Sequence, residues 1–113
     1  MTAAEHVVAV VLAAGASTRM GTAKQLLTVD GKSLLQIAVD AAACAMPEVC
    51  QSVVVLGANA EQIRDAVDFG QSKVLQNNDW QRGLSSSIVC AVKYIEQNLP
   101  QASGVILMLA DQP

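Results

Sequence analysis

The sequence predicts an α/β domain built on a doubly wound, mostly parallel sheet with strand order 3-2-1-4. Two observations carry this prediction: short apolar runs rich in Val, Ile and Leu recur along the chain, and amphipathic helical patterns lie between them. Strands that alternate with helices pair in parallel through right-handed crossovers. Ligands bind such sheets beyond the carboxyl ends of the strands where the strand order reverses, here between the first and the fourth strand.

The first strand is predicted at residues 7–12, a continuous β-branched run typical of a strand that is covered on both faces. A loop is expected over residues 13–31. Ser33 is the predicted cap of a helix that continues to about Ala45. The apolar side chains of this helix share one face at helical spacing, and they are Leu34, Leu35, Ala38, Val39 and Ala42.

The middle of the chain repeats the pattern of strand and helix. The second strand is predicted at residues 52–56, another buried apolar run. Asn59 is the predicted cap of the next helix, with Gln62 as its capping-box partner, and this helix is expected to end near Val67. A short third strand is predicted at residues 73–76.

The last helix is expected to begin at Ser85 or Ser86 and to end near Asn98. Its predicted inward side chains are Leu84, Ile88, Ala91, Val92 and Ile95. The fourth strand, GVILMLA at residues 104–110, can lie at an edge of the sheet. Because an exposed apolar edge invites pairing with another chain, we expect self-association through this strand, or a longer natural protein of which the chain is a piece.

The composition indicates the class of protein. The chain has 113 residues, of which 52% are hydrophobic, and its net charge is −3. We expect residues 1–113 to form a single domain with its own core. The mild acidity argues against a nucleic-acid partner, and no apolar run reaches the roughly 18 residues that span a membrane. The first residues lack the cationic segment of a signal peptide, and the three cysteines fit core-filling thiols, so a cytoplasmic location is expected.

The segment at residues 10–24, VVLAAGASTRMGTAK, is the strongest functional signal. Small residues let backbone N–H groups approach a ligand, and Arg19 and Lys24 add positive charge, so the segment predicts a phosphate-binding site. It is not a Walker loop, because five residues separate Gly15 from Gly21, and the G-x-G-x-x-G fingerprint is absent. The alternative is a plain turn, which the length and the two cations disfavour.

Asp111, which follows the fourth strand, is the predicted magnesium ligand. Mg²⁺ keeps several waters and binds through one or two carboxylates plus substrate phosphates. Because the first and fourth strands are neighbours in the predicted order, Asp111 and the phosphate-binding segment are expected to face one crevice. The alternative is that Asp111 only starts a turn ahead of Pro113.

Residues 12–24 resemble the signature L-A-A-G-x-S-x-R-M-G-x-x-K of nucleotidyltransferases of the molybdenum cofactor cytidylyltransferase type. These belong to the wider molybdopterin-guanine-dinucleotide-synthase-like group. The similarity continues in Gln25, in Gly31, in residues 77–87 and in residues 111–113. It implies a Rossmann-like nucleotidyltransferase fold that is truncated after the fourth strand, because the chain covers only the first part of the family's usual length.

By this resemblance, the domain binds a nucleoside triphosphate with Mg²⁺ and transfers a nucleoside monophosphate to a phosphorylated acceptor, releasing pyrophosphate. The favoured reaction is CMP transfer from CTP to molybdopterin, because Ala14 stands where guanylyl relatives carry a second glycine. The alternatives are a related cytidylyl- or guanylyltransferase with a methylerythritol-phosphate or sugar-phosphate acceptor, and a nucleotide-binding fragment without activity. A catalytic triad is not expected, because the only histidine, His6, lies at the far end of the first strand.

The resemblance also implies roles for single residues. Arg19 and Lys24 are the predicted catalytic residues, since they would neutralise the triphosphate and the leaving pyrophosphate. Within residues 77–87, Gly83 would let the backbone approach the nucleoside, Trp80 would anchor the segment, and the serines would contact the nucleoside unless they only cap the helix. The predicted nucleotide-binding residues are Leu12, Ala13, Ala14, Gly15, Ser17, Arg19, Lys24, Asn77, Gly83 and Ser86, and the predicted metal ligand is Asp111.

Overall fold

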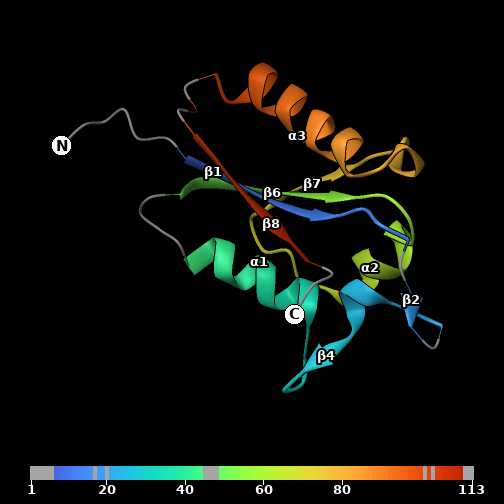
Figure 1. Cartoon of the computed structure of the whole chain (residues 1–113). Coiled ribbons are helices and arrows are strands. Elements are labelled where there is room, and N and C mark those ends of the chain that lie inside the picture. Colours follow the sequence, from blue (N-terminus) through green and yellow to red (C-terminus); the bar gives the residue numbers. More distant parts are fainter. Residues whose placement is uncertain are drawn as a thin grey trace.

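A central sheet of four parallel strands organises the fold (Figure 1). The computed structural model describes residues 7–16, 18–19, 21–44, 49–100, 102 and 104–110. The strands, in the order in which they lie in the sheet, are β7 (Lys73–Gln76), β6 (Val49–Leu56), β1 (Val7–Ala13) and β8 (Gly104–Leu109). Counted along the chain, this is the order 3-2-1-4, so the predicted fold class and strand order are confirmed.

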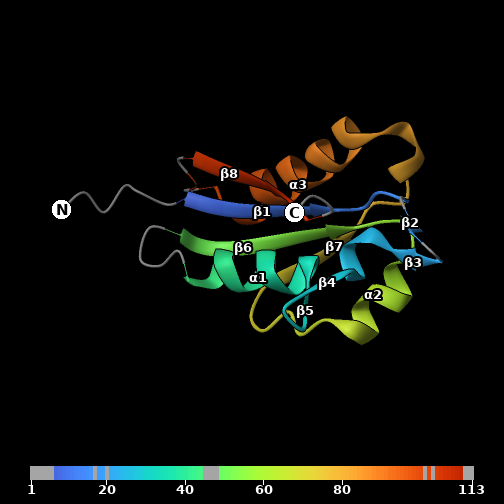
Figure 2. The ribbon, with the colours of Figure 1, turned by 60° about the horizontal axis from the view of Figure 1, so that its bottom comes forward.

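Helices cover both faces of this sheet (Figure 2). α1 (Leu34–Cys44) and α2 (Ala60–Ala66) pack on one face, and α3 (Leu84–Asn98) packs on the other. Alternate residues of β1 point into the two cores: Ala9, Val11 and Ala13 toward α1 and α2, and Val8, Val10 and Leu12 toward α3. Burial of both faces explains why the sequence of β1 is apolar without interruption.

The segment predicted as a loop after β1 contains short regular elements. Its two antiparallel pairs and its 3-10 helix are β2 (Thr18–Arg19) with β3 (Thr22–Ala23), η1 (Lys24–Leu26), and β4 (Thr28–Val29) with β5 (Lys32–Ser33). Strands of two residues carry no periodic pattern, so they cannot be predicted from the sequence.

Local hydrogen bonds set the helix boundaries. Ser33 caps α1 as predicted, because its Oγ accepts a hydrogen bond of 3.0 Å from the backbone N–H of Gln36. The second strand begins earlier than predicted, at Val49, where it pairs with the first residue of β1. The predicted side-chain cap of α2 is wrong, because Asn59 adopts a left-handed φ of 61° and its side chain makes no capping hydrogen bond.

The start of α3 also differs from the prediction. The helix begins at Leu84 after Gly83, whose φ is 101° and which has no side chain to cap it, so the predicted opening at Ser85 or Ser86 is wrong. The predicted burial of Leu84 and Val92 is wrong as well, since they are 53% and 40% exposed. The fully buried residues of α3 are Ser87, Ala91 and Ile95. A polar residue therefore takes the inward position of the first turn, and apolar periodicity alone does not reveal it.

β8 lies at one edge of the sheet, as the sequence predicts. Three of its side chains, Val105, Ile106 and Leu107, are between 43% and 50% exposed. Cys90 packs partly buried against the core beneath α3, and this burial raises the pKa of its thiol, in agreement with a core-filling role. Across the described ranges, no helix combines the length and the apolar character needed to cross a membrane. His6 lies outside the described residues.

Candidate functional site

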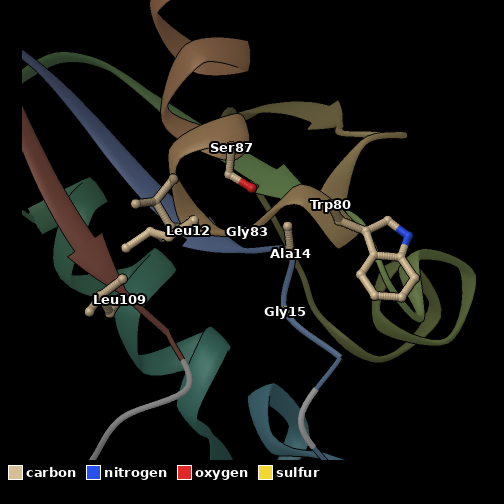
Figure 3. Close-up of a pocket in the computed structure, with 8 residues that line it drawn as sticks. Leu12, Ala14, Gly15, Trp80, Gly83, Ser87 and Leu109 are labelled. Carbon is tan, nitrogen blue, oxygen red and sulfur yellow. The ribbon is translucent and has the colours of Figure 1, made fainter.

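A pocket opens at the carboxyl end of β1, between β8 and the start of α3 (Figure 3). Its volume is about 230 Å³. One wall comes from β1, the loop after it and β8, through Leu12, Ala14, Gly15 and Leu109. The other wall comes from the 3-10 helix η2 (Trp80–Arg82) and the beginning of α3, through Trp80, Gly83, Leu84 and Ser87. The strand order reverses here, so the pocket lies where the topology predicts a ligand.

The backbone at Gly57 and Ala58, beside the pocket, is in close contact with its neighbours. The N–H of Ala58 donates a hydrogen bond of 3.1 Å to the carbonyl oxygen of Ala14. A Cβ atom added to Gly57 would lie 2.6 Å from the Cβ of Trp80 and 2.9 Å from both the Cβ and the carbonyl oxygen of Ala14. Glycine is therefore required where the end of β6 meets the loop and η2. Trp80 also packs against the core beneath α3, in agreement with its predicted role as an anchor.

Gln25 bonds to the start of the loop after β1, which the sequence predicts to bind phosphate. Its side chain is 1% exposed, and its Nε2 donates hydrogen bonds of 2.9 Å to the carbonyl oxygen of Ala13 and 3.0 Å to that of Gly15. The Oε1 atom of Gln25 is buried and has no hydrogen-bond partner in the described part of the chain. Two carbonyl acceptors require the amide nitrogen on their side, so they fix the orientation of the amide group.

An order-of-magnitude estimate gives Gln25 only a small net contribution to the free energy of unfolding. Each hydrogen bond adds about 1 kcal/mol net, whereas an unpaired buried acceptor costs about 1–3 kcal/mol. These terms nearly cancel. No role for Gln25 follows from the sequence, where it is a polar residue that directly precedes two leucines and continues the family resemblance.

Asn77 joins the end of β7 to the first turn of α3. It is 5% exposed, and its Nδ2 donates hydrogen bonds of 2.9 Å to Oγ of Ser86 and 3.0 Å to Oγ of Ser87. Its Oδ1 accepts a hydrogen bond of 2.9 Å from the backbone N–H of Asp79. Both amide hydrogens are thus used within the protein, and Asn77 acts here by positioning the two serines.

The two serines differ in whether their hydroxyl proton is available to a ligand. Oγ of Ser86 lies 2.7 Å from the carbonyl oxygen of Gly83 and 3.0 Å from that of Asp79, so its proton is used within the protein. Ser87 accepts from Asn77, and no acceptor for its own proton is found among the described residues. Ser87 is 3% exposed and lines the pocket, so it offers a ligand a hydroxyl donor.

The structure brings together part of the predicted nucleotide-binding set. Four of these residues line the pocket, namely Leu12, Ala14, Gly15 and Gly83. Ala13 and Asn77 are buried and do not line it. Lys24 begins η1 and is half-buried, and it is not among the lining residues. Ser86 bonds to Asn77 and is not among the lining residues either. The other predicted positions, Ser17, Asp111 and the side chain of Arg19, lie outside what the structure describes.

A metal ion at this site would need oxygen ligands. Within the described ranges, no group of three or more His, Cys, Asp or Glu side chains can hold a metal ion. The N–H of Ala110 donates a hydrogen bond of 3.2 Å to the carbonyl oxygen of Leu12, so the chain leaves β8 beside the loop, and Asp111 comes next in sequence. Asp111 itself lies outside the described residues, so its role as a magnesium ligand stays a prediction.

Comparison with known proteins gives the family. The sequence model of the MobA-like NTP transferase domain matches residues 9–113. The chain belongs to this family. The resemblance seen in the phosphate-binding segment is thereby confirmed at the level of the family. Among curated proteins, the nicotine blue oxidoreductase of Paenarthrobacter nicotinovorans is 33% identical over 109 residues, which cover 95% of this chain and 50% of that protein.

Solved structures agree with this assignment. Rv0371c from Mycobacterium tuberculosis H37Rv superposes with a TM-score of 0.80 at 34% identity, over 97% of this chain and 53% of that one. A complex of Rv0371c with manganese gives 0.74 at 30% identity, over 96% and 52%. A nucleotidyl transferase from Methanothermobacter thermautotroptrophicus gives 0.71 at 27% identity, over 96% and 51%. The chain spans about half the length of these relatives.

Proposed function

We propose that the protein is a nucleotidyltransferase that binds a nucleoside triphosphate with Mg²⁺ and transfers the nucleoside monophosphate to a phosphorylated acceptor. The observation that carries this proposal is the pocket at the point where the strand order reverses, walled by the glycine-containing loop after β1. Membership in the MobA-like NTP transferase family supports the reaction class. The family alone does not decide the activity, because one fold supports many reactions.

In this proposal the pocket binds the nucleoside and the loop after β1 binds the phosphates. The nucleoside occupies the pocket beside Trp80, and the hydroxyl of Ser87 donates to an oxygen of the base or the ribose. The phosphates extend past Gly15, where small loop residues expose backbone N–H groups. Lys24 and Arg19 supply the opposite charge, Lys24 as a point charge and Arg19 as a planar fork.

The proposed reaction needs no covalent enzyme intermediate. An oxygen of the acceptor phosphate attacks the α-phosphorus in line, and the bond from that phosphorus to the oxygen that bridges to the β-phosphorus breaks. Pyrophosphate leaves with the bonding electron pair. Lys24 and Arg19 neutralise the charge that grows on it, and the loop and the pocket supply the positioning. A magnesium ion held by Asp111 would add positive charge at the phosphates, and the manganese complex of the relative Rv0371c supports a divalent metal.

CTP is the proposed nucleotide and molybdopterin the proposed acceptor. Both choices depend on the resemblance of residues 12–24, and Ala14 supports the cytidine nucleotide. We place the protein in the cytoplasm, where such an acceptor would be made and used. We also propose that the open edge of β8 pairs with a further strand, either of a longer polypeptide or of a second copy of the chain. A monodisperse monomer of residues 1–113 by light scattering at high concentration would contradict pairing between copies.

Pyrophosphate release with each of the four ribonucleoside triphosphates tests the proposed reaction in the full-length protein. We expect release with CTP, Mg²⁺ and molybdopterin. Release only with a sugar phosphate or methylerythritol phosphate would overturn the acceptor, and release only with another triphosphate would overturn the base. Binding of CTP–Mg²⁺ by calorimetry without any release would indicate a nucleotide-binding module. Asp111→Asn should abolish the magnesium dependence of CTP binding, and retained dependence would place the metal elsewhere.

A further inference from the structure

We propose that Gln25 is a positioning residue that fixes the backbone of the phosphate-binding loop in the form that receives the anion, and this inference rests on the proposed nucleotide binding. The basis is a side chain that is 1% exposed and that donates from one nitrogen atom to the carbonyl oxygens of Ala13 and Gly15. Gln25 follows Lys24 directly in the sequence but does not line the pocket. Its effect on a ligand is therefore exerted through the loop backbone.

The direction of the carbonyl groups determines the direction of the N–H groups. In a trans peptide unit the C=O and the following N–H point in opposite directions. Because Gln25 draws the carbonyl oxygens of Ala13 and Gly15 toward itself, the N–H groups of Ala14 and Ala16 point away from it. Two outward-facing N–H groups on small residues, Ala14 and Ala16, can donate to an anion, here a phosphate of the nucleotide.

Among the described residues Oε1 of Gln25 has no hydrogen-bond partner, so stability alone does not explain this side chain. Its two hydrogen bonds and its buried, unpartnered acceptor nearly cancel in free energy, as estimated above. A methionine of similar size would fill the same space without leaving an acceptor unpaired. The substitution Gln25→Met should thus leave the fold near its original stability while it releases both carbonyl groups.

The test combines a measurement without ligand and two binding probes in the full-length protein. In Gln25→Met, hydrogen exchange at the amides of residues 14–16 should become faster. The affinities for CTP–Mg²⁺ and for inorganic tripolyphosphate should fall by the same factor, about tenfold to thirtyfold for two lost hydrogen bonds. Ser87→Ala should weaken CTP binding and leave tripolyphosphate binding unchanged. Gln62→Met, the same exchange at an exposed glutamine of α2, is the matched control and should change neither measurement.

A second variant, Gln25→Glu, tests the same inference if Gln25→Met does not fold. Its carboxylate would repel the two carbonyl oxygens, and its protonated form can donate to one of them, so loop protection and tripolyphosphate affinity should rise as the pH is lowered. Unchanged exchange at residues 14–16 in both variants would overturn the inference. Faster exchange with wild-type affinity for both probes would also overturn it. If the wild-type protein binds neither probe while Gln25→Met speeds exchange, the proposed function is wrong and the positioning of the loop by Gln25 stands.

Discussion

Replacing Gly57 by alanine tests whether the pocket depends on the close packing beside it. The added Cβ would lie 2.6 Å from the Cβ of Trp80 and 2.9 Å from two atoms of Ala14. Carbon atoms in contact normally lie about 3.5–4.0 Å apart, so the neighbours of Gly57→Ala must move by roughly 1 Å. Since Trp80 and Ala14 both line the pocket, the displacement reaches the proposed ligand directly.

Two opposing terms set the stability of Gly57→Ala. Overpacking of this kind costs about 1–3 kcal/mol. Alanine also restricts the unfolded chain, which stabilises by about 0.4–1 kcal/mol at a position whose backbone permits it. Gly57 permits it, because it is not among the glycines with a positive φ. The overpacking term is the larger, so we expect a net loss of about 1–2 kcal/mol in the free energy of unfolding. A displacement of this size at the site should lower the transfer rate by up to about 100-fold.

Urea unfolding measures the loss of stability, pyrophosphate release measures the transfer rate, and calorimetry with CTP–Mg²⁺ measures the affinity of the pocket. Gly104→Ala is the control, because its added Cβ would lie 3.9 Å from Cγ2 of Val7, an ordinary contact. We expect the control to keep the wild-type urea midpoint and CTP affinity. If Gly57→Ala also kept both, the contacts of Gly57 with Trp80 and Ala14 would not determine the shape of the pocket, and the packing argument would be refuted.

Three further predictions concern charge and hydrogen bonding. Lys24→Ala should weaken the binding of every nucleoside triphosphate by about tenfold or more, measured by calorimetry, and an unchanged affinity would remove Lys24 from the site. Ser87→Ala should weaken CTP binding by about fivefold while Ser86→Ala does not, because only the Ser87 proton is available; equal losses would contradict this. Hydrogen bonds from Lys32 and then Gln36 lower the pKa of Asp40, so this carboxylate stabilises the fold above its unfolded-state pKa of about 3.9, and the contribution is lost as the pH falls through the lowered value. The pair is exposed, so Asp40→Asn should cost less than about 1 kcal/mol at pH 7 in urea unfolding and nothing at pH 2.

The central sheet could be predicted because each strand carries its own signal. Burial on both faces leaves an apolar run such as residues 7–12, and the helices between the runs dictate parallel pairing. The place of the pocket follows from the same topology. Leu12, Gly15 and Gly83, which the family resemblance implies as nucleotide-binding residues, line this one pocket although they are far apart in sequence.

The details that failed depend on contacts between elements. At the start of α3, Gly83 precedes the helix and Asn77 donates a hydrogen bond to Ser87 in its first turn. A capping rule that considers only neighbouring residues predicts neither feature. Leu84 is predicted as a core residue because it falls at helical spacing with other apolar residues, yet it is 53% exposed and lines the pocket. Leu109, at the end of an edge strand, is also exposed and also lines the pocket. The hydrogen bonds of Gln25 are equally non-local, so no pattern around position 25 predicts them.

The carbonyl groups of the phosphate-binding segment explain how a loop of small residues becomes an ordered site. From residue 12 to residue 15, each carbonyl accepts a hydrogen bond from within the protein, and the donors in that order are Ala110, Gln25, Ala58 and again Gln25. These donors come from the end of β8, from η1 and from the segment after β6, so folding of the sheet orders residues 12–15 before any ligand arrives. A ligand then binds without the entropic cost of ordering that backbone. In the proposed function, the small side chains permit the close approach of a phosphate, and the hydrogen-bond donors behind residues 12–15 provide the rigidity that makes this approach favourable.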